Sequence, residues 1–220
     1  MPRALELYSG TASVSHVLQH NGWETVTVDN RAKFKPTIVA DITTLDYTQF
    51  TKGEFDYIHI SPPCTEYSRA LSTRPRRLEE ADKLALRGLE ILAYLQPRYW
   101  TIENPDGLLK TRWFMQPLEQ WLHKISYCKY SDHTTQFKYK KPTCIWTNLN
   151  WVPRPMCCKA SPCEWVAGKT MHPQNAQKMQ NPGREKVNLS TQQLGRLPHS
   201  LVQEWVDAML VHSIPDTIPE

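Results

Sequence analysis

A cysteine that directly follows a predicted buried strand is the residue best placed to do chemistry. The apolar run 57–60 is typical of a strand, and it ends at Ser61-Pro62-Pro63 because consecutive prolines donate no ladder hydrogen bonds. Cys64 comes next, so a stiff loop would hold its thiol at the carboxyl end of a strand, where open α/β sheets bind ligands. A thiol held there is a candidate nucleophile. Taken in isolation, a cysteine in such a turn is more often a buried structural thiol.

A second segment has the same layout and favours the nucleophile. Residues 100–102 are typical of a strand, Glu103 follows, and Asn104-Pro105 comes next. A carboxyl group and a thiol from two strand ends of one sheet can act on a single substrate.

The elements that would position these groups alternate between strands and helices. In order, we predict a strand over residues 4–8, a loop of small residues over 9–13, a helix over 14–20, and strands over 23–28 and 37–41. Asp29 and Asp41 end the last two strands, and an acid there commonly hydrogen-bonds ribose hydroxyls. We therefore expect a doubly wound α/β sheet that binds a nucleoside-containing cofactor. The alternative is that Gly10 forms only a turn and Asp29 is only a solvated acid.

Composition narrows the class of protein further. The 220 residues suffice for one domain of ordinary size, and a net charge of +4 with a pI of about 8.7 permits nucleic-acid binding without requiring it. No run of about 18 apolar residues predicts a membrane span, and no leader is recognisable. We therefore expect an intracellular, non-secreted protein whose six cysteines serve metal binding or catalysis rather than disulfides.

The order of the motifs resembles the DNA cytosine methyltransferases that act on carbon 5 of the base. The matching residues are Glu6-Leu7-Tyr8-Ser9-Gly10, Asp29, Asp41, Pro62-Pro63-Cys64, Glu103-Asn104, Gln136-x-Lys138-x-Lys140, the strand 144–147 and the closing elements 189–198. The resemblance implies a Rossmann-like class I fold that uses S-adenosylmethionine. The catalytic domain would comprise residues 1–149 and 189–214, with a small inserted target-recognition region over 150–188 and a loose tail over 215–220.

The same resemblance implies a role for each site residue. Cys64 would attack carbon 6 of cytosine, Glu103 would hydrogen-bond ring nitrogen 3 and the exocyclic amine, and the base would be flipped out or single-stranded. Lys138 and Lys140 would complete the catalytic set by placing positive charge beside the base; a cluster of this kind is otherwise a solvated basic face. The implied cofactor-binding residues are Tyr8, Ser9, Gly10, Thr11, Ala12, Asp29, Asn30, Asp41, Ile42 and Pro62. The implied substrate-binding residues are Pro63, Ser68, Arg69, Asn104, Pro105 and Gln136.

Several positions depart from the family pattern. Ala12 stands where the family often has a glycine, lysines replace both arginines of the Gln-x-Arg-x-Arg element, and the family's C-terminal asparagine has no clear counterpart. The short insert is similar to those of methyltransferases from phages, large viruses and mobile elements.

The remaining segments predict packing helices and a basic loop. Residues 69–77 carry four arginines and no acid, which suits a loop closing over phosphates or a disordered surface loop. Apolar spacing predicts helices over 78–95, 114–125 and 201–210.

The insert also contains a candidate metal site. Cys157, Cys163 and His172 are the proposed ligands of a structural zinc ion, with Cys158 able to contribute and no obvious fourth ligand elsewhere. The alternative is a set of reduced surface thiols.

Three other functions remain open from the sequence. The first is methylation of an exocyclic amine, which needs no thiol. The second is methylation of cytosine in RNA. The third is nucleic-acid binding by a decayed active site, which loss of Cys64 or Glu103 would indicate. The expected partner is DNA, with RNA not excluded, no membrane is expected, and a monomer is the default.

Overall fold

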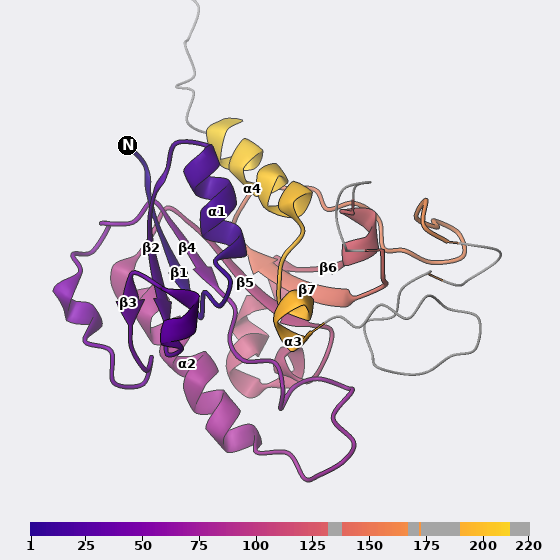
Figure 1. Cartoon of the computed structure of the whole chain (residues 1–220), viewed down its shortest axis with the longest axis horizontal. Helices are drawn as coiled ribbons and strands as arrows, with labels where there is room; N and C mark the ends of the chain where they lie inside the picture. Colours follow the sequence, from indigo (N-terminus) through magenta and orange to yellow (C-terminus); the bar gives the residue numbers. More distant parts are fainter. Residues whose placement is uncertain (132–137, 167–171, 173–189, 212–220) are drawn as a thin grey trace, which may run out of the picture.

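Figure 1 shows the fold of the chain in a computed structural model, which describes residues 1–131, 138–166, 172 and 190–211. Strands β1 to β5 run in parallel through the centre, and β6 and β7 form a hairpin-like pair at one edge. The strands are β1 (Arg3–Leu7), β2 (Glu24–Asp29), β3 (Ile38–Val39), β4 (Tyr57–Ile60), β5 (Tyr99–Pro105), β6 (Leu122–Ser126) and β7 (Pro142–Thr147). The α-helices are α1 (Ser13–His20), α2 (Leu78–Leu95), α3 (Thr191–Leu194) and α4 (His199–Val211). The 3₁₀ helices are η1 (Ala32–Phe34), η2 (Tyr47–Gln49), η3 (Leu109–Thr111), η4 (Trp113–Trp121) and η5 (Tyr127–Lys129).

The sheet has seven strands in the order β3-β2-β1-β4-β5-β7-β6, and β7 is antiparallel to both of its neighbours. The chain builds outward from β1 to β3, then returns to place β4 on the other side of β1. This reversal is the topological switch point of a doubly wound sheet, so the predicted fold class is confirmed.

Helices cover both faces of the sheet, as a largely parallel sheet requires. On one face α1 and α4 lie side by side (Figure 1), and they pack on strand residues such as Ala4 and Tyr57. On the other face α2 packs on Leu5 and Ile58. Because successive strand residues point to opposite faces, strands such as β1, β4, β5 and β7 contribute to both hydrophobic clusters.

The predicted helix over 114–125 is wrong. The chain forms the 3₁₀ helix η4, which contains Pro117, and then the edge strand β6. Proline lacks the N–H that an α-helix would use at this position. Residues of β6 pair instead with β7, from Leu122 opposite Trp146 to Ser126 opposite Pro142.

Strand β5 is longer than the sequence predicts. Glu103 and Asn104 lie within it rather than in a loop after it, because β7 runs alongside and pairs with them through Ile145 and Cys144. A strand is a stiffer support than a loop, so the carboxyl group of Glu103 is more firmly placed than expected.

Some sequence predictions fall outside the described residues. These include Gln136, the tail 215–220, and all of the proposed insert 150–188 except residues 150–166 and His172. Among the helices that the structure describes, no stretch is both long and apolar enough to span a bilayer.

Candidate active site

A cavity of about 1030 Å³ opens at the carboxyl ends of the parallel strands. Its walls come from the loops after β1, β2, β3, β4 and β5, from the segment before β7, and from α3 and the residues after it. The sequence-predicted residues that line it are Tyr8, Ser9, Gly10, Thr11, Asp29, Asn30, Asp41, Ile42, Pro62, Pro63, Cys64, Ser68, Arg69, Glu103, Pro105 and Lys140. Loops far apart in sequence therefore meet where the topology predicts a ligand site.

Cys64 and Glu103 line this one cavity. They come together because β4 and β5 are parallel neighbours in register, with Ile60 opposite Ile102, so the residues after Ile60 pass alongside Glu103. The structure therefore places in one cavity the thiol and the carboxyl that the sequence analysis pairs.

Two hydroxyl groups fix the Glu103 side chain, which is 5 % exposed. Ser61 donates to Oε2 at 3.1 Å, and Tyr127 donates to Oε1 at 2.9 Å. A buried hydrogen bond to a charged group contributes about 1.5–3 kcal/mol. Each carboxylate oxygen can accept a further hydrogen bond, so these contacts orient Glu103 without exhausting its capacity to bind a ligand.

A buried chain of hydrogen bonds continues behind Ser61. Its hydroxyl lies 3.0 Å from Nε2 of His59, and Nδ1 of that ring lies 2.6 Å from Oγ1 of Thr101. Because Ser61 gives its proton to Glu103, His59 must donate from Nε2 and accept at Nδ1. Burial lowers the pKa of His59 to about 3, so the ring stays neutral and holds this single tautomer. Sequence reasoning missed His59 because it lies within an apolar strand.

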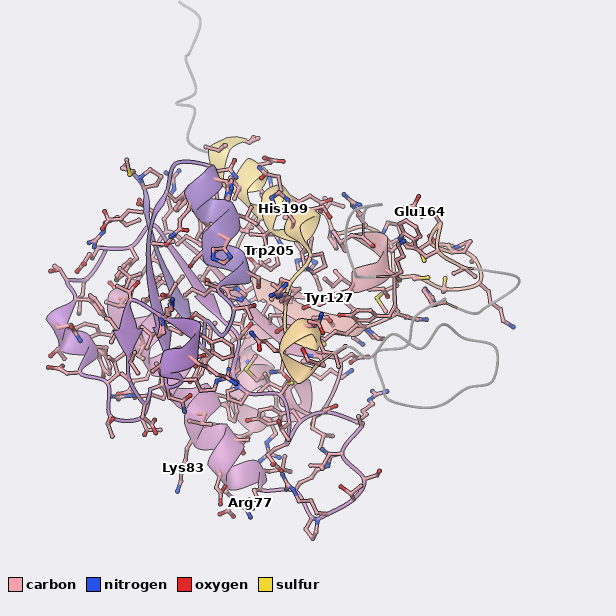
Figure 2. The ribbon with its side chains drawn as sticks, viewed as in Figure 1. Arg77, Lys83, Tyr127, Glu164, His199 and Trp205 are labelled. Carbon is pink, nitrogen blue, oxygen red and sulfur yellow. The ribbon has the colours of Figure 1, made fainter. Side chains whose placement is uncertain are left out.

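Lys141, which the sequence analysis did not select, forms an ion pair with Glu103, and its charge also acts on Cys64. Its ammonium lies 3.7 Å from Oε1 of Glu103 and 4.4 Å from the ring centre of Tyr127, and it donates to the carbonyl of Leu194 at 3.0 Å. Figure 2 shows Tyr127 near α3, the helix that ends at Leu194. Lys141 therefore links the base of the cavity to the C-terminal part of the chain.

The loop that carries Cys64 is anchored from behind by Tyr67. The Tyr67 hydroxyl donates to buried Asp82 at 2.9 Å, and Arg112 pairs with the same carboxylate. The Tyr67 carbonyl accepts from the backbone of Leu108 at 2.9 Å, and it would lie 2.2 Å from a β-carbon at position 107. Only glycine can stand at position 107 without displacing the catalytic loop.

Asn104 supports the same loop from β5. It is fully buried, does not line the cavity, and donates from Nδ2 to the Pro62 carbonyl at 2.9 Å. Its observed contact is thus to the double-proline turn.

The environment of Cys64 shifts the pKa of its thiol in opposing directions. Part of the residue is open to solvent, yet the cavity walls surround the thiol, and this burial raises the pKa of Cys64. The positive charge of Lys141 lowers the same pKa, and the negative charge of Glu103 raises it. In the free protein the thiolate is therefore a minority species at neutral pH, and Lys141 is its main electrostatic support.

Replacement of Lys141 by alanine is expected to slow alkylation of Cys64 severalfold near neutral pH. Loss of the ammonium raises the thiol pKa, which leaves less thiolate to react. Iodoacetamide labelling of the Cys64 peptide, followed by mass spectrometry across a pH series, measures the effect. Lys140→Ala is the matched control, because Lys140 also lines the cavity but contributes no resolved effect on Cys64. Equal labelling rates for Lys141→Ala and the unmodified protein would contradict this role.

The opposite end of the cavity has the features of a nucleoside-binding site. Asp29 is buried and accepts from the backbone N–H of Gly10 at 2.8 Å, which ties the first loop to the end of β2. Gly10 has φ +49°, a conformation that favours glycine. The Ser9 hydroxyl is buried beside it with no partner among the described residues, so a polar ligand would satisfy it.

Two further residues shape this end. Ala12, the cap of α1, has φ 53° and ψ 39°. An alanine in the left-handed conformation costs about 1 kcal/mol. This cost explains why the family often has a glycine at the position of Ala12. Ala12 itself does not line the cavity. Glu6 does line it, and burial raises the pKa of Glu6 to about 7, against hydrogen bonds from Ser15 that lower it.

Lys138 and the arginine loop are placed differently from the expectation. The Lys138 ammonium lies 4.6 Å from the ring centre of Trp165, and Lys138 does not line the cavity. Within the loop, Arg74 pairs with Glu66, and Arg76 donates to three carbonyls of residues 66–71. Those two arginines therefore stabilise the loop itself, whereas Arg69 faces the cavity.

The fold and site define a class of protein before any comparison is made. A sheet in this order, with its ligand cavity at the switch point, is that of the class I S-adenosylmethionine-dependent methyltransferases. Residues 4–139 match the family described as C-5 cytosine-specific DNA methylase. The chain therefore belongs to the DNA (cytosine-5-)-methyltransferase family of enzymes.

The proteins similar to this chain include a viral relative and solved structures. The chain is 35 % identical over 176 residues to the "Probable DNA (cytosine-5)-methyltransferase" of Frog virus 3, covering 72 % of this chain and 77 % of the relative. Its fold is similar to an E. coli prophage-encoded protein assigned as a DNA modification methyltransferase, with a TM-score of 0.50 at 14 % identity, covering 71 % and 52 % of the two chains. The S. pombe Dnmt2 methyltransferase is similar with a TM-score of 0.46 at 18 % identity, covering 66 % and 48 %. The chain spans about half the length of these two solved structures.

Proposed function

We propose that this protein methylates carbon 5 of cytosine in DNA, using S-adenosylmethionine and a covalent bond between Cys64 and the base. The observation that carries the proposal is the meeting of Cys64 and Glu103 in one cavity that continues to a nucleoside-type site. Membership of the family supports methylation at carbon 5.

The cofactor end of the cavity fits S-adenosylmethionine. The unpartnered Ser9 hydroxyl, the glycine loop held by Asp29, and Asp41 at the rim offer polar groups of the kind that bind an amino acid and a ribose. S-adenosylmethionine, when bound, supplies a methyl group on a sulfonium for a nucleophilic carbon to accept.

Cys64 and Glu103 would together make carbon 5 that nucleophile. The Cys64 thiolate adds to carbon 6, and the electron pair that this releases is drawn toward ring nitrogen 3. Nitrogen 3 receives a proton that the Glu103 carboxyl takes up from solvent and passes on. Carbon 5 becomes enamine-like and takes the methyl group. Loss of the carbon 5 proton to solvent and return of the nitrogen 3 proton to Glu103 then expel the thiolate and restore the ring.

The remaining residues of the site would position these two. Ser61 and Tyr127 hold the Glu103 carboxyl from two sides. Lys141 favours the thiolate and lies where negative charge develops on the base. A base inside a duplex cannot reach such a cavity, so the cytosine would be flipped out or taken from a single strand.

The test is capture of the covalent intermediate. DNA that contains 5-fluorocytosine should form a stable adduct with the protein when S-adenosylmethionine is present, because fluorine cannot leave as a proton does. Peptide mapping should place the adduct on Cys64. Methylation of ordinary cytosine without any adduct would favour exocyclic-amine chemistry instead, and binding with neither product would favour a decayed site.

Parallel incubation with RNA separates the remaining alternative. We expect the adduct and carbon 5 methylation on DNA. Methylation that is confined to an RNA of the same sequence would contradict the proposed substrate while leaving the chemistry intact.

A further inference from the structure

Four metal-ligating side chains lie together outside the active site, at the far end of β6. Cys128, Cys157, Cys163 and His172 place one ligand atom each within 4.8 Å of one another, and all four residues are buried. The sequence analysis selected three of them and lacked a fourth. Cys128, which precedes the others by 29 residues or more in the sequence, completes the set, whereas Cys158 is exposed and lies outside it.

The geometry matches tetrahedral zinc. With Zn–S near 2.3 Å and Zn–N near 2.0 Å, tetrahedral coordination places ligand atoms about 3.5–3.8 Å apart. Nε2 of His172 lies 3.2 Å from Sγ of Cys163 and 3.5 Å from Sγ of Cys157. A single nitrogen aimed at two sulfurs is the arrangement of a shared ion. A disulfide would use two of the three thiols and leave the histidine and the third sulfur unexplained.

The segment around the cluster has little regular structure and few apolar contacts at the cluster. The described residues between β7 and Val166 form no helix or strand, and their apolar support at the cluster is limited to Trp165 and Val166. Polar tethers bring this segment to η5: the Lys129 ammonium donates to Ser161 and to the Pro162 carbonyl at 3.0 and 2.8 Å. Figure 2 shows Glu164, the neighbour of Cys163, on the loop beyond β6. Structural zinc commonly orders segments too small for a core of their own.

We propose that Cys128, Cys157, Cys163 and His172 form a structural zinc site that fastens residues 154–166 and His172 to the end of β6. Cys128 lies in η5, directly after β6, and the other three ligands lie in the segment after β7. The ion would therefore join these two parts of the chain. Coordination favours the thiolate forms of the cysteines and the neutral histidine, which binds through Nε2.

The proposed zinc site would also affect the active site, because the ligand Cys128 is adjacent in sequence to a residue that contacts Glu103. Tyr127, the residue before Cys128, donates its hydroxyl to Oε1 of Glu103. Fixing Cys128 thereby fixes η5 and the direction of this hydrogen bond. This consequence rests on the proposed function of Glu103, but the zinc site itself does not.

Metal content of the purified full-length protein tests the proposal. Elemental analysis should find one zinc per chain in the unmodified protein, and Cys128→Ser should lose it. Cys158→Ser is the matched control and should keep the full zinc content, as should Cys64→Ser, so that the result is independent of catalysis. Full zinc in Cys128→Ser, or a folded unmodified protein that holds none, would overturn the site.

Cobalt substitution keeps the proposal testable if Cys128→Ser does not fold. After zinc is removed with a chelator, Co²⁺ added to the unmodified protein should give the visible bands of tetrahedral cobalt and the near-ultraviolet charge-transfer intensity of three thiolates. Octahedral cobalt bands, or no binding with the fold retained, would show that the four residues are reduced side chains and not a metal site.

Discussion

Replacement of Cys64 by serine is expected to lower methyl transfer to cytosine at least about a thousandfold while S-adenosylmethionine still binds. A serine hydroxyl keeps the shape of the side chain, but it yields far less anion near neutral pH and is a poorer nucleophile toward carbon 6. Without addition at carbon 6, carbon 5 remains unreactive, and Glu103 has no developing charge to neutralise. Transfer of a labelled methyl group from the cofactor to DNA, measured at saturating substrate, reports the loss.

Cys158→Ser is the control for this experiment, because Cys158 is exposed and distant in sequence from the cavity wall. Its rate should equal that of the unmodified protein. Cofactor binding by calorimetry should be the same in both variants. Substantial methylation by Cys64→Ser would require a route without a covalent intermediate, as amine methylation has.

The pairing of Cys64 with Glu103 could be predicted from the sequence because it depends on topology alone. Parallel neighbours end at the same edge of a sheet, so two strands identified by their apolar runs suffice to place the residues that follow them. The double proline after β4 strengthened the prediction, since it marks where the ladder must stop. The cofactor loop was predictable for the same reason.

Contacts made by the antiparallel edge could not be predicted in this way. Pro117 was a visible sign against a helix over 114–125, but the apolar spacing obscured the edge strand β6. Tyr127 and Cys128 follow that strand, so misplacing it concealed both the hydroxyl that holds Glu103 and the fourth ligand of the metal cluster.

Alternation along an extended chain does not identify the lysine that lies beside Glu103. The resemblance to the Gln-x-Arg-x-Arg element implies Lys138 and Lys140, and an extended chain would place both on one face. In the structure Lys138 lies over Trp165, while Lys141 reaches Glu103. The ring that draws Lys138 away belongs to a segment 27 residues later, and local spacing carries no information about it.

Replacement of Glu103 by glutamine is expected to lower kcat by about a hundredfold to a thousandfold, with a smaller effect on binding of DNA. The amide has nearly the same size as the carboxyl, but it cannot give a proton to ring nitrogen 3. The hydroxyls of Ser61 and Tyr127 donate to the two carboxylate oxygens of Glu103. In the glutamine variant, one of these hydroxyls would face an NH₂ group instead. Single-turnover methylation measures the chemical step directly.

The adduct with 5-fluorocytosine DNA separates the roles of the two groups. Glu103→Gln should still form it, but slowly, because the nucleophile is intact and only the stabilisation of charge on the base is lost; Cys64→Ser should form none. Glu119→Gln makes the same chemical change at an exposed position on η4, away from the cavity, and should behave like the unmodified protein. If Glu103→Gln retained the full single-turnover rate, the carboxyl would serve only to hold the fold, and the buried hydrogen bonds from Ser61 and Tyr127 would have to be interpreted as structural.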